Sequence, residues 1–215
     1  MFVGHLAVAL GVKRAEPRIP LAALVAAAFA LDLIWPLLLL AGVEHVTIDP
    51  GNTAFTPLWF DHYPWSHSLV MSIVWGALAW VLATRRRIPG TAGLFLGATV
   101  VSHWALDFIS HRPDLPLWPG GPAVGLGLWN SIPATIIVEG LLFAAAIEVY
   151  RRAYPPRDAV GRWSFGGLVA LTGIIWISGP FGPPPPSPGA IAVVGLALWL
   201  LPLWAGWIDR HRANH

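Results

Sequence analysis

Long apolar runs separated by short polar segments organise this chain of 215 residues. A helix that crosses a membrane needs about 20 predominantly apolar residues. Six runs meet or approach that length, at residues 20–43, 66–84, 90–110, 130–150, 164–179 and 189–208. The proline-rich segment between the last two cannot be helical. The pattern predicts one all-α integral membrane domain over residues 1–215, a bundle of about six transmembrane helices.

Residues 1–12 form a further apolar run that is too short to span a membrane. As a helix it would measure about 18 Å, roughly half a bilayer. We expect an N-terminal half-helix that rises into the membrane from Lys13 and places His5 near the midplane. The alternative is a helix lying in the membrane interface with His5 exposed. The run lacks a basic start and a small-residue cleavage site, so it does not read as a cleavable signal peptide.

Composition supports a membrane protein and narrows its chemistry. Hydrophobic residues make up 56% of the chain and charged residues only 11%, where soluble domains are about 25% charged. Cysteine is absent, so a metal site would have to use His, Asp and Glu. No basic run exceeds three residues and none is interleaved with stacking aromatics, so we expect no nucleic-acid partner.

The basic residues predict the topology. If all six runs span, twelve of the 13 fall on one side and only Arg112 lies opposite. The twelve are Lys13, Arg14, Arg18, Arg85, Arg86, Arg87, Arg151, Arg152, Arg157, Arg162, Arg210 and Arg212. Positive residues favour the cytoplasmic side. We therefore expect a multi-pass protein of a bacterial inner membrane, with both termini on or toward the cytoplasmic side and the loops 44–65 and 111–129 outside.

Two histidines and an aspartate recur at intervals of four residues within one apolar run, as His103, Asp107 and His111. On a helix these side chains point to one side. Ionisable groups at membrane depth are costly unless they pair, line water or bind an ion. Nitrogen and carboxylate donors one turn apart also suit a transition metal. We interpret the trio as metal ligands, with His111 nearest the outer surface.

Counting depth along the other runs adds partners. His5, Asp32 and His67 fall in the same outer half of the membrane and are predicted metal ligands; Glu139 lies at that depth too. A lone polar residue in a span is often only a packing hydrogen bond, and this alternative stays open for Glu139. His62 is a further candidate ligand, although a solvated loop histidine is the default there. The candidate site occupies residues 1–150, and the spans within 164–208 are predicted to be accessory.

A His and carboxylate donor set without thiolates fits a divalent metal, with zinc first and manganese or iron as alternatives. The number of donors allows one to three ions. Two ions about 3.5–4 Å apart can stabilise both the attacking and the leaving oxygen of a phosphoester. Asp32 is predicted to bind or bridge ions and orient the attacking water, and Glu139 is the second candidate catalytic carboxylate. Neither a Gly-x-Ser-x-Gly elbow nor a P-loop is present.

Several of these residues carry a family resemblance. Gly4-His5, Asp32, His62-x4-His67-Ser68 and Ser102-His103-x3-Asp107 resemble the bacterial membrane-bound metal-dependent hydrolases, some of which are SOS-regulated inner-membrane proteins. The resemblance covers about residues 1–120. It implies a multi-span hydrolase in which five residues, His5, Asp32, His67, His103 and Asp107, bind metal. The chain departs from the family after Asp32, where many relatives carry a further Asp and His.

A weaker analogy is to the all-α zinc phospholipase C and P1 nuclease family. Its ligand order is similar to that of His5, Asp32, His67, His103, Asp107, His111 and Glu139. That family usually has a histidine where this chain has Thr135. The analogy implies a three-zinc site.

The leading hypothesis is a metal-dependent hydrolase acting on a phosphoester of a lipid or lipid-linked substrate, with membrane lipids as partners. The alternative is a transporter or channel that passes protons or a divalent metal through the same residues. A third hypothesis is a scaffold in which the metal only holds helices together. The sequence does not indicate an oligomeric state.

Overall fold

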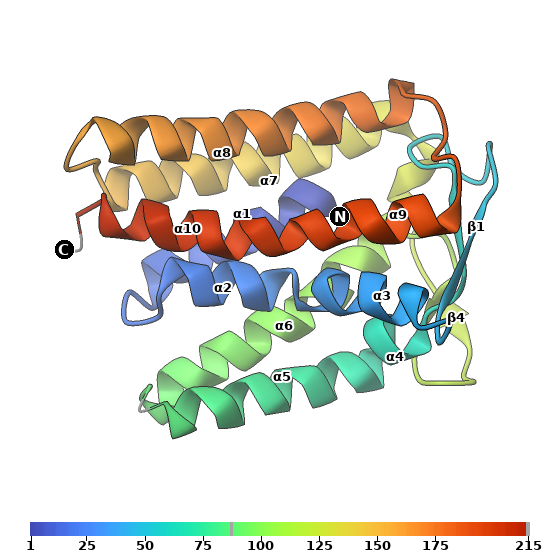
Figure 1. The fold of residues 1–215 in the computed structure, drawn as a ribbon, viewed down its shortest axis with the longest axis horizontal. Helices are drawn as coiled ribbons and strands as arrows, with labels where there is room; N and C mark the ends of the chain where they lie inside the picture. The colour runs from blue at the N-terminus through green and yellow to red at the C-terminus, as the bar shows by residue number, and fades with distance from the viewer. Residues whose placement is uncertain (87, 214–215) are drawn as a thin grey trace.

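Helices account for most of the chain in the computed structural model, which describes residues 1–86 and 88–213 (Figure 1). The helices are α1 (Phe2–Ala15), α2 (Leu21–Ala28), α3 (Ala30–Leu40), α4 (Pro64–His67), α5 (Leu69–Arg85), α6 (Gly90–Ser110), α7 (Ile132–Ala153), α8 (Ala159–Ser178), α9 (Pro188–Gly195) and α10 (Leu200–Arg210). Short 3₁₀ turns lie at Leu128–Asn130, Gly179–Phe181 and Leu196–Trp199. The predicted all-α bundle is confirmed.

Each of the six predicted spans corresponds to helix. Within the described residues, four helical segments are long and apolar enough to cross a membrane: Gly90–Ser110, Ile132–Ala153, Ala159–Phe181 and Pro188–Arg210. The pair α2 and α3 makes a fifth if it is counted as one broken span. The apolar helix α5 has 17 residues, about 26 Å of helix. The chain is therefore a membrane protein, and the crossing by α5 stays a prediction.

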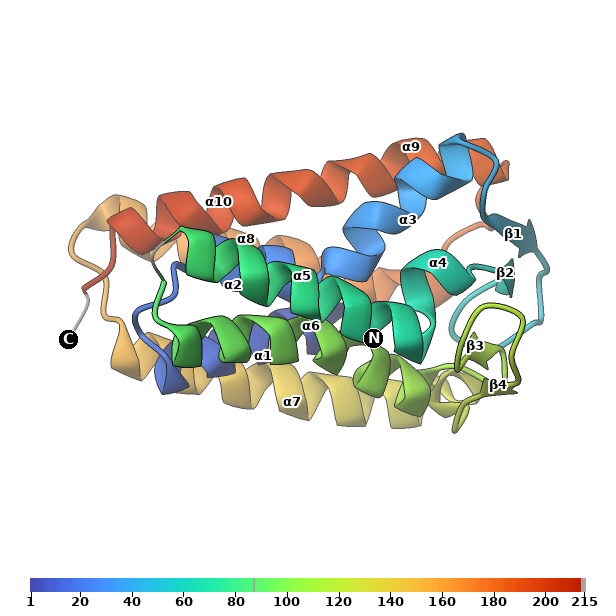
Figure 2. The ribbon, with the colours of Figure 1, turned by 90° about the horizontal axis from the view of Figure 1, so that it is seen from below.

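A bend of 55° separates α2 from α3 at Phe29. Figure 2 shows α3 leaving the direction of α2 and running toward α9. Farther along α3, Pro36 has no N–H to donate to the carbonyl of Asp32, four residues earlier. Asp32 therefore lies between two interruptions of helical hydrogen bonding, the break at Phe29 and the missing N–H of Pro36.

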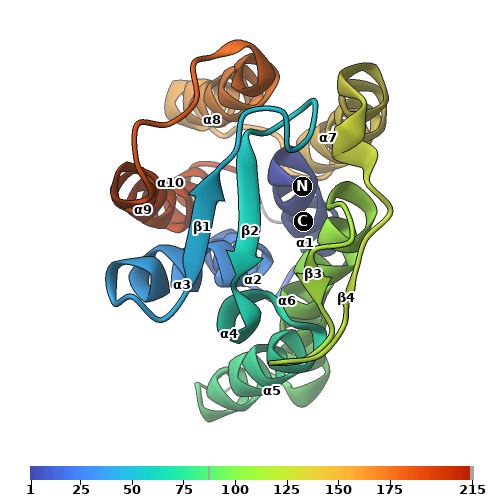
Figure 3. The ribbon, with the colours of Figure 1, turned by 90° about the vertical axis from the view of Figure 1, so that its right-hand side faces the viewer.

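The N-terminal helix α1 lies inside the bundle. It packs against α2, α6, α7 and α8, and the end-on view places it among them (Figure 3). His5 is buried, with 2% of its surface exposed. The alternative of an interfacial helix with an exposed His5 is wrong, because α1 has partners on several sides. The half-helix is an internal element of the bundle.

The helices α5 and α6 form an antiparallel pair with a close approach at two glycines. A Cβ atom built on Gly97 would lie 2.8 Å from the carbonyl oxygen of Gly76. Only glycine allows backbones to come this near without displacement. The contact fixes α6, the helix that carries His103 and Asp107.

The two ends of the bundle differ in character. One end carries two small antiparallel sheets, β1 (His45–Ile48) with β2 (Leu58–His62) and β3 (Leu115–Pro116) with β4 (Ala123–Val124) (Figure 3). The opposite end carries the connections after α1, α5 and α7 and the C-terminal end of α10 (Figure 1). The predicted basic segments fall at this second end, although Arg87 lies outside the described residues. Arg112 lies at the sheet end, where it contacts Asp114 and Trp59.

Candidate metal centre

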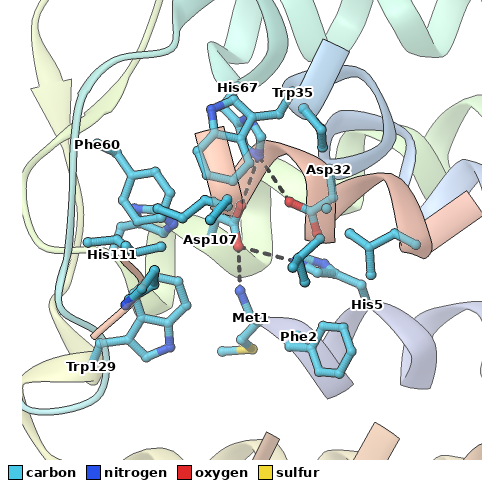
Figure 4. Close-up of a pocket in the computed structure, with 18 of the residues that line it drawn as sticks. Met1, Phe2, His5, Asp32, Trp35, Phe60, His67, Asp107, His111 and Trp129 are labelled. Carbon is cyan, nitrogen blue, oxygen red and sulfur yellow. Dashed lines mark hydrogen bonds and ion pairs between the residues drawn. The ribbon is translucent and has the colours of Figure 1, made fainter. Parts of the chain in front are cut away.

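Helix α6 supplies the centre of the site. His103 and Asp107 are one turn apart, and His103 Nε2 lies 3.1 Å from Asp107 Oδ2. His103 is fully buried and Asp107 is 2% exposed. Buried charge of this kind requires paired partners or a bound ion. The predicted face of α6 therefore points into the protein, where the other donors meet it (Figure 4).

The break between α2 and α3 orients His103. The last carbonyls of a helix have no intrahelical donor, and Ala28 is the last residue of α2. His103 Nδ1 lies 2.7 Å from the Ala28 carbonyl oxygen and donates to it. The proton on Nδ1 leaves the lone pair on Nε2, and no hydrogen-bond partner for this buried nitrogen exists among the described residues. A ligating histidine is commonly held this way by its second nitrogen.

Asp32 and His67 approach the same point from α3 and α4. His67 Nε2 is 3.5 Å from Asp32 Oδ1 and 4.0 Å from Asp107 Oδ2. Asp32 Oδ1 is also 3.7 Å from His103 Nε2. The Asp32 side chain is 25% exposed, against 3% for Asp107. Asp32 is thus the carboxylate of the cluster that is most accessible to water or a ligand.

The N-terminal helix completes the cluster on the other side of Asp107. His5 Nε2 is 3.3 Å from Asp107 Oδ1, and the His5 ring stacks on His103 at 3.6 Å between centroids. The backbone nitrogen of Met1 donates to the same Asp107 oxygen at 2.5 Å and to Ser110 Oγ at 3.3 Å. Oδ1 of Asp107 therefore faces Met1 and His5, whereas Oδ2 faces His103 and His67.

The donors fit a divalent metal ion. Two overlapping groups are present in the described chain, His5 with His103 and Asp107, and Asp32 with His67 and His103; within each, the ligand atoms lie within 4.8 Å of one another. Tetrahedral zinc with bonds of about 2.0–2.1 Å places its ligand atoms about 3.3 Å apart. The measured separations of 3.1 to 4.0 Å are close to this value. Because both groups use His103 Nε2, they cannot each bind a separate ion through it.

Three predicted residues lie outside both groups. His111 lines the same cavity, but its Nδ1 is 3.0 Å from Asp114 Oδ1 and 3.3 Å from the Tyr63 hydroxyl. Glu139 is fully buried on α7, and its Oε1 accepts from Trp129 Nε1 at 3.4 Å. His62 is exposed on β2, with its ring beside that of His45. The structure does not bring His62 to the cluster, and metal binding by His111 stays a prediction.

The cluster forms the polar floor of a cavity of about 520 Å³. Figure 4 shows Asp32, His67, Asp107 and His5 converging there, with aromatic side chains beside them. Most of the wall is apolar, from α3, β2 and α9, and includes Trp35, Pro36, Leu58, Phe60, Ile191 and Val194. Val194 is 71% exposed on the outer surface of the bundle. The cavity therefore reaches the apolar exterior beside α9.

Comparison with protein-family models, curated proteins and solved structures finds no match to this chain. The resemblance noted from the sequence therefore remains a hypothesis.

Sequence reasoning missed the residues behind the donors. Glu44 and Ser66 are buried beside His67 and connected to it by hydrogen bonds. Burial and the Asp114 carboxylate raise the pKa of the buried Tyr63 hydroxyl well above its ordinary value, so this group stays protonated. Glu44 and Tyr63 lie in irregular segments and Ser66 in the four-residue helix α4, where no periodic pattern can be read. Tyr63 and Ser66 are close in sequence to the predicted ligand His67, whereas no sequence signal indicated Glu44.

Proposed function

We propose that the protein is a membrane-embedded, metal-dependent hydrolase that cleaves a phosphoester of a lipid or lipid-linked substrate. One observation carries the proposal: three histidines and two aspartates converge at the floor of an apolar cavity. Such a cavity accepts acyl chains, and the floor offers donors for an ion and for the phosphate.

Three residues are assigned to one ion, zinc by preference: His67, His103 and Asp107, which leaves the fourth position of a tetrahedral ion open to water. Asp107 Oδ2 lies 3.1 Å from His103 Nε2 and 4.0 Å from His67 Nε2, and Asp32 Oδ1 lies beside both histidines, at 3.5 Å from His67 Nε2 and 3.7 Å from His103 Nε2. His5 lies on the second oxygen of Asp107 and orients that carboxylate. When bound, a divalent metal lowers the pKa of water and polarises a phosphoryl oxygen.

Asp32 is assigned to accept a proton from the attacking water. It is the accessible carboxylate of the cluster, whereas Asp107 has partners on both oxygens. A general base must reach the proton that it removes, either directly or through one water. Glu139 is kept as the second candidate catalytic carboxylate; it lies on α7, which packs against α1.

His111 is assigned to protonate the leaving oxygen. Its Nδ1 faces the Asp114 carboxylate, which holds the ring in one orientation, as in acid–base pairs of other hydrolases. Its ring lines the cavity beside Phe60 and Trp129. This assignment replaces metal binding by His111 as the role that we favour.

The lipid character of the substrate follows from the cavity wall. Ile191 and Val194 of α9, with Trp35 and Pro36 of α3, line an opening toward the surface that would face lipid. A water-soluble phosphoester would gain little from such a wall. With the basic end in the cytoplasm, the site would face the outer leaflet of a bacterial inner membrane.

The test uses the purified protein in lipid nanodiscs, loaded with zinc. Hydrolysis products would be measured for each lipid class: inorganic phosphate from phosphomonoester and pyrophosphate lipids, and the phosphomonoester and alcohol from phosphodiester lipids, with a water-soluble aryl phosphate for comparison. We expect release from at least one lipid class, sensitive to a chelator and lost in His103→Ala. The matched control is His45→Ala, an exposed histidine outside the cavity.

The transport hypothesis is tested with the same preparation. Zinc or proton uptake into proteoliposomes, without hydrolysis of any lipid class, would overturn the hydrolase proposal.

A further inference from the structure

A buried carboxylate and a serine form a hydrogen-bonded chain behind His67. Glu44, in the loop between α3 and β1, is 1% exposed, and Ser66 in α4 is fully buried. Ser66 Oγ lies 2.6 Å from Glu44 Oε2 and 2.7 Å from His67 Nδ1. The other ring nitrogen, His67 Nε2, faces Asp32 Oδ1 at 3.5 Å. The chain therefore runs from a loop carboxylate to the metal-facing nitrogen.

The direction of these hydrogen bonds follows from what each group can donate. Glu44 Oε1 accepts from the backbone N–H groups of Trp65 and Ser66, at 2.7 and 2.8 Å. An ionised carboxylate only accepts, so the single proton of the Ser66 hydroxyl points to Oε2. The hydroxyl oxygen then accepts from His67 Nδ1. His67 carries its proton on Nδ1, and Nε2 keeps a lone pair.

We propose that Glu44 is a positioning residue that acts through Ser66 to hold His67 in the Nδ1–H form, so that Nε2 can bind metal. The inference rests on the proposed assignment of His67 as a ligand. Second nitrogens of ligating histidines commonly have such partners, and their loss weakens metal binding about 10- to 100-fold. Here the partner is Ser66. Because its proton is donated to Glu44, its oxygen accepts the hydrogen bond from His67 Nδ1.

Substitution of Glu44 by glutamine reverses that polarity with almost no change in shape. The two backbone N–H groups hold the position of Oε1, so the amide oxygen must stay there. The amide NH₂ then faces Ser66 Oγ and donates to it. The Ser66 proton turns toward His67 Nδ1 at 2.7 Å, which is nearer than the other acceptor, the Tyr63 carbonyl oxygen at 3.4 Å, so Nδ1 becomes an acceptor. His67 moves its own proton to Nε2, the nitrogen needed for metal.

The readout is the tautomer of His67 in metal-free protein, from ¹⁵N chemical shifts of histidine-labelled protein in nanodiscs. Signals of His67 are assigned from their loss in His67→Ala. We expect the Nδ1–H form in the wild type and the Nε2–H form in Glu44→Gln. The zinc Kd, measured by chelator competition, should be about 10- to 100-fold higher in the variant. Glu16→Gln is the matched control, because Glu16 is a buried carboxylate paired with Arg18 at the other end of the bundle.

An unchanged His67 tautomer and zinc Kd in folded Glu44→Gln would overturn the proposal. If that variant does not fold, Ser66→Ala decides: the proposal expects a mixture of both His67 tautomers, and a purely Nδ1–H form would contradict it. The tautomer is read without metal or substrate. A wild type with the expected tautomer but no hydrolysis of any lipid class would refute the proposed function and leave the role of Glu44 standing.

Discussion

Replacement of Asp107 by asparagine should remove most of the stability that the protein gains from a metal ion. Asp107 belongs to the donor group with His5 and His103; its Oδ1 faces His5, and its Oδ2 faces His103 and His67. The asparagine side chain keeps the shape but loses the charge that attracts the ion. Structural zinc sites with four ligands bind with about 10–16 kcal/mol. One ligand is thus worth roughly 3 kcal/mol, or about 100-fold in Kd.

The expected shift follows from mass action. Zinc at 100 times the wild-type Kd stabilises the folded state by about 2.7 kcal/mol. If Kd rises about 100-fold, the same concentration equals the Kd of the variant and contributes about 0.4 kcal/mol. The difference of about 2.3 kcal/mol corresponds to about 5–9 °C in Tm for a chain of this length.

Thermal unfolding in detergent, with and without zinc, measures this difference directly. Each variant is its own reference, so a change in the stability of the metal-free protein cancels. His45→Ala should keep the full zinc-induced rise in Tm, because His45 is exposed on β1. An equal zinc-induced rise in Asp107→Asn and wild type would refute the assignment of Asp107 as a ligand.

Three further substitutions test separate parts of the account. Asp32→Asn should slow lipid hydrolysis at least 100-fold with unchanged zinc content, the usual effect of losing a general base; a rate within twofold of wild type would exclude that role. Ile191→Trp should fill the cavity mouth and raise KM for a long-chain lipid about tenfold with unchanged zinc content, and an unchanged KM would place substrate entry elsewhere. Gly97→Val should lower the unfolding free energy by about 1–3 kcal/mol, because the new Cβ meets the Gly76 carbonyl at 2.8 Å; unchanged denaturant unfolding would show that the two helices separate freely.

Periodicity and depth were sufficient to predict the main parts of the site. His103 and Asp107 are four residues apart on one helix, and that spacing alone brings their side chains together. Asp32 and His67 joined them because apolar helices of similar length place residues of similar depth side by side. His62 did not, because α4 turns the chain between His62 and His67 and leaves His62 on the edge of β2.

The other residues of the site are brought to it by tertiary contacts, which a local sequence pattern does not predict. The Glu44 carboxylate accepts hydrogen bonds from the backbone N–H groups of Trp65 and Ser66, 21 and 22 positions later in the chain. An acidic loop residue is ordinarily solvated, so these bonds were not expected from the sequence. Ile191 and Val194 were predicted to belong to an accessory span, yet they wall the cavity. An apolar residue that faces lipid and one that lines a cavity look alike in sequence.

The metal content of the purified protein shows whether His103 and Asp107 hold a metal ion. Wild type and the double variant His103→Ala, Asp107→Ala would be purified in parallel, incubated with zinc, separated from free metal and analysed by mass spectrometry. We expect at least one zinc ion per wild-type chain and almost none in the double variant. Equal metal content in the two proteins would contradict this expectation.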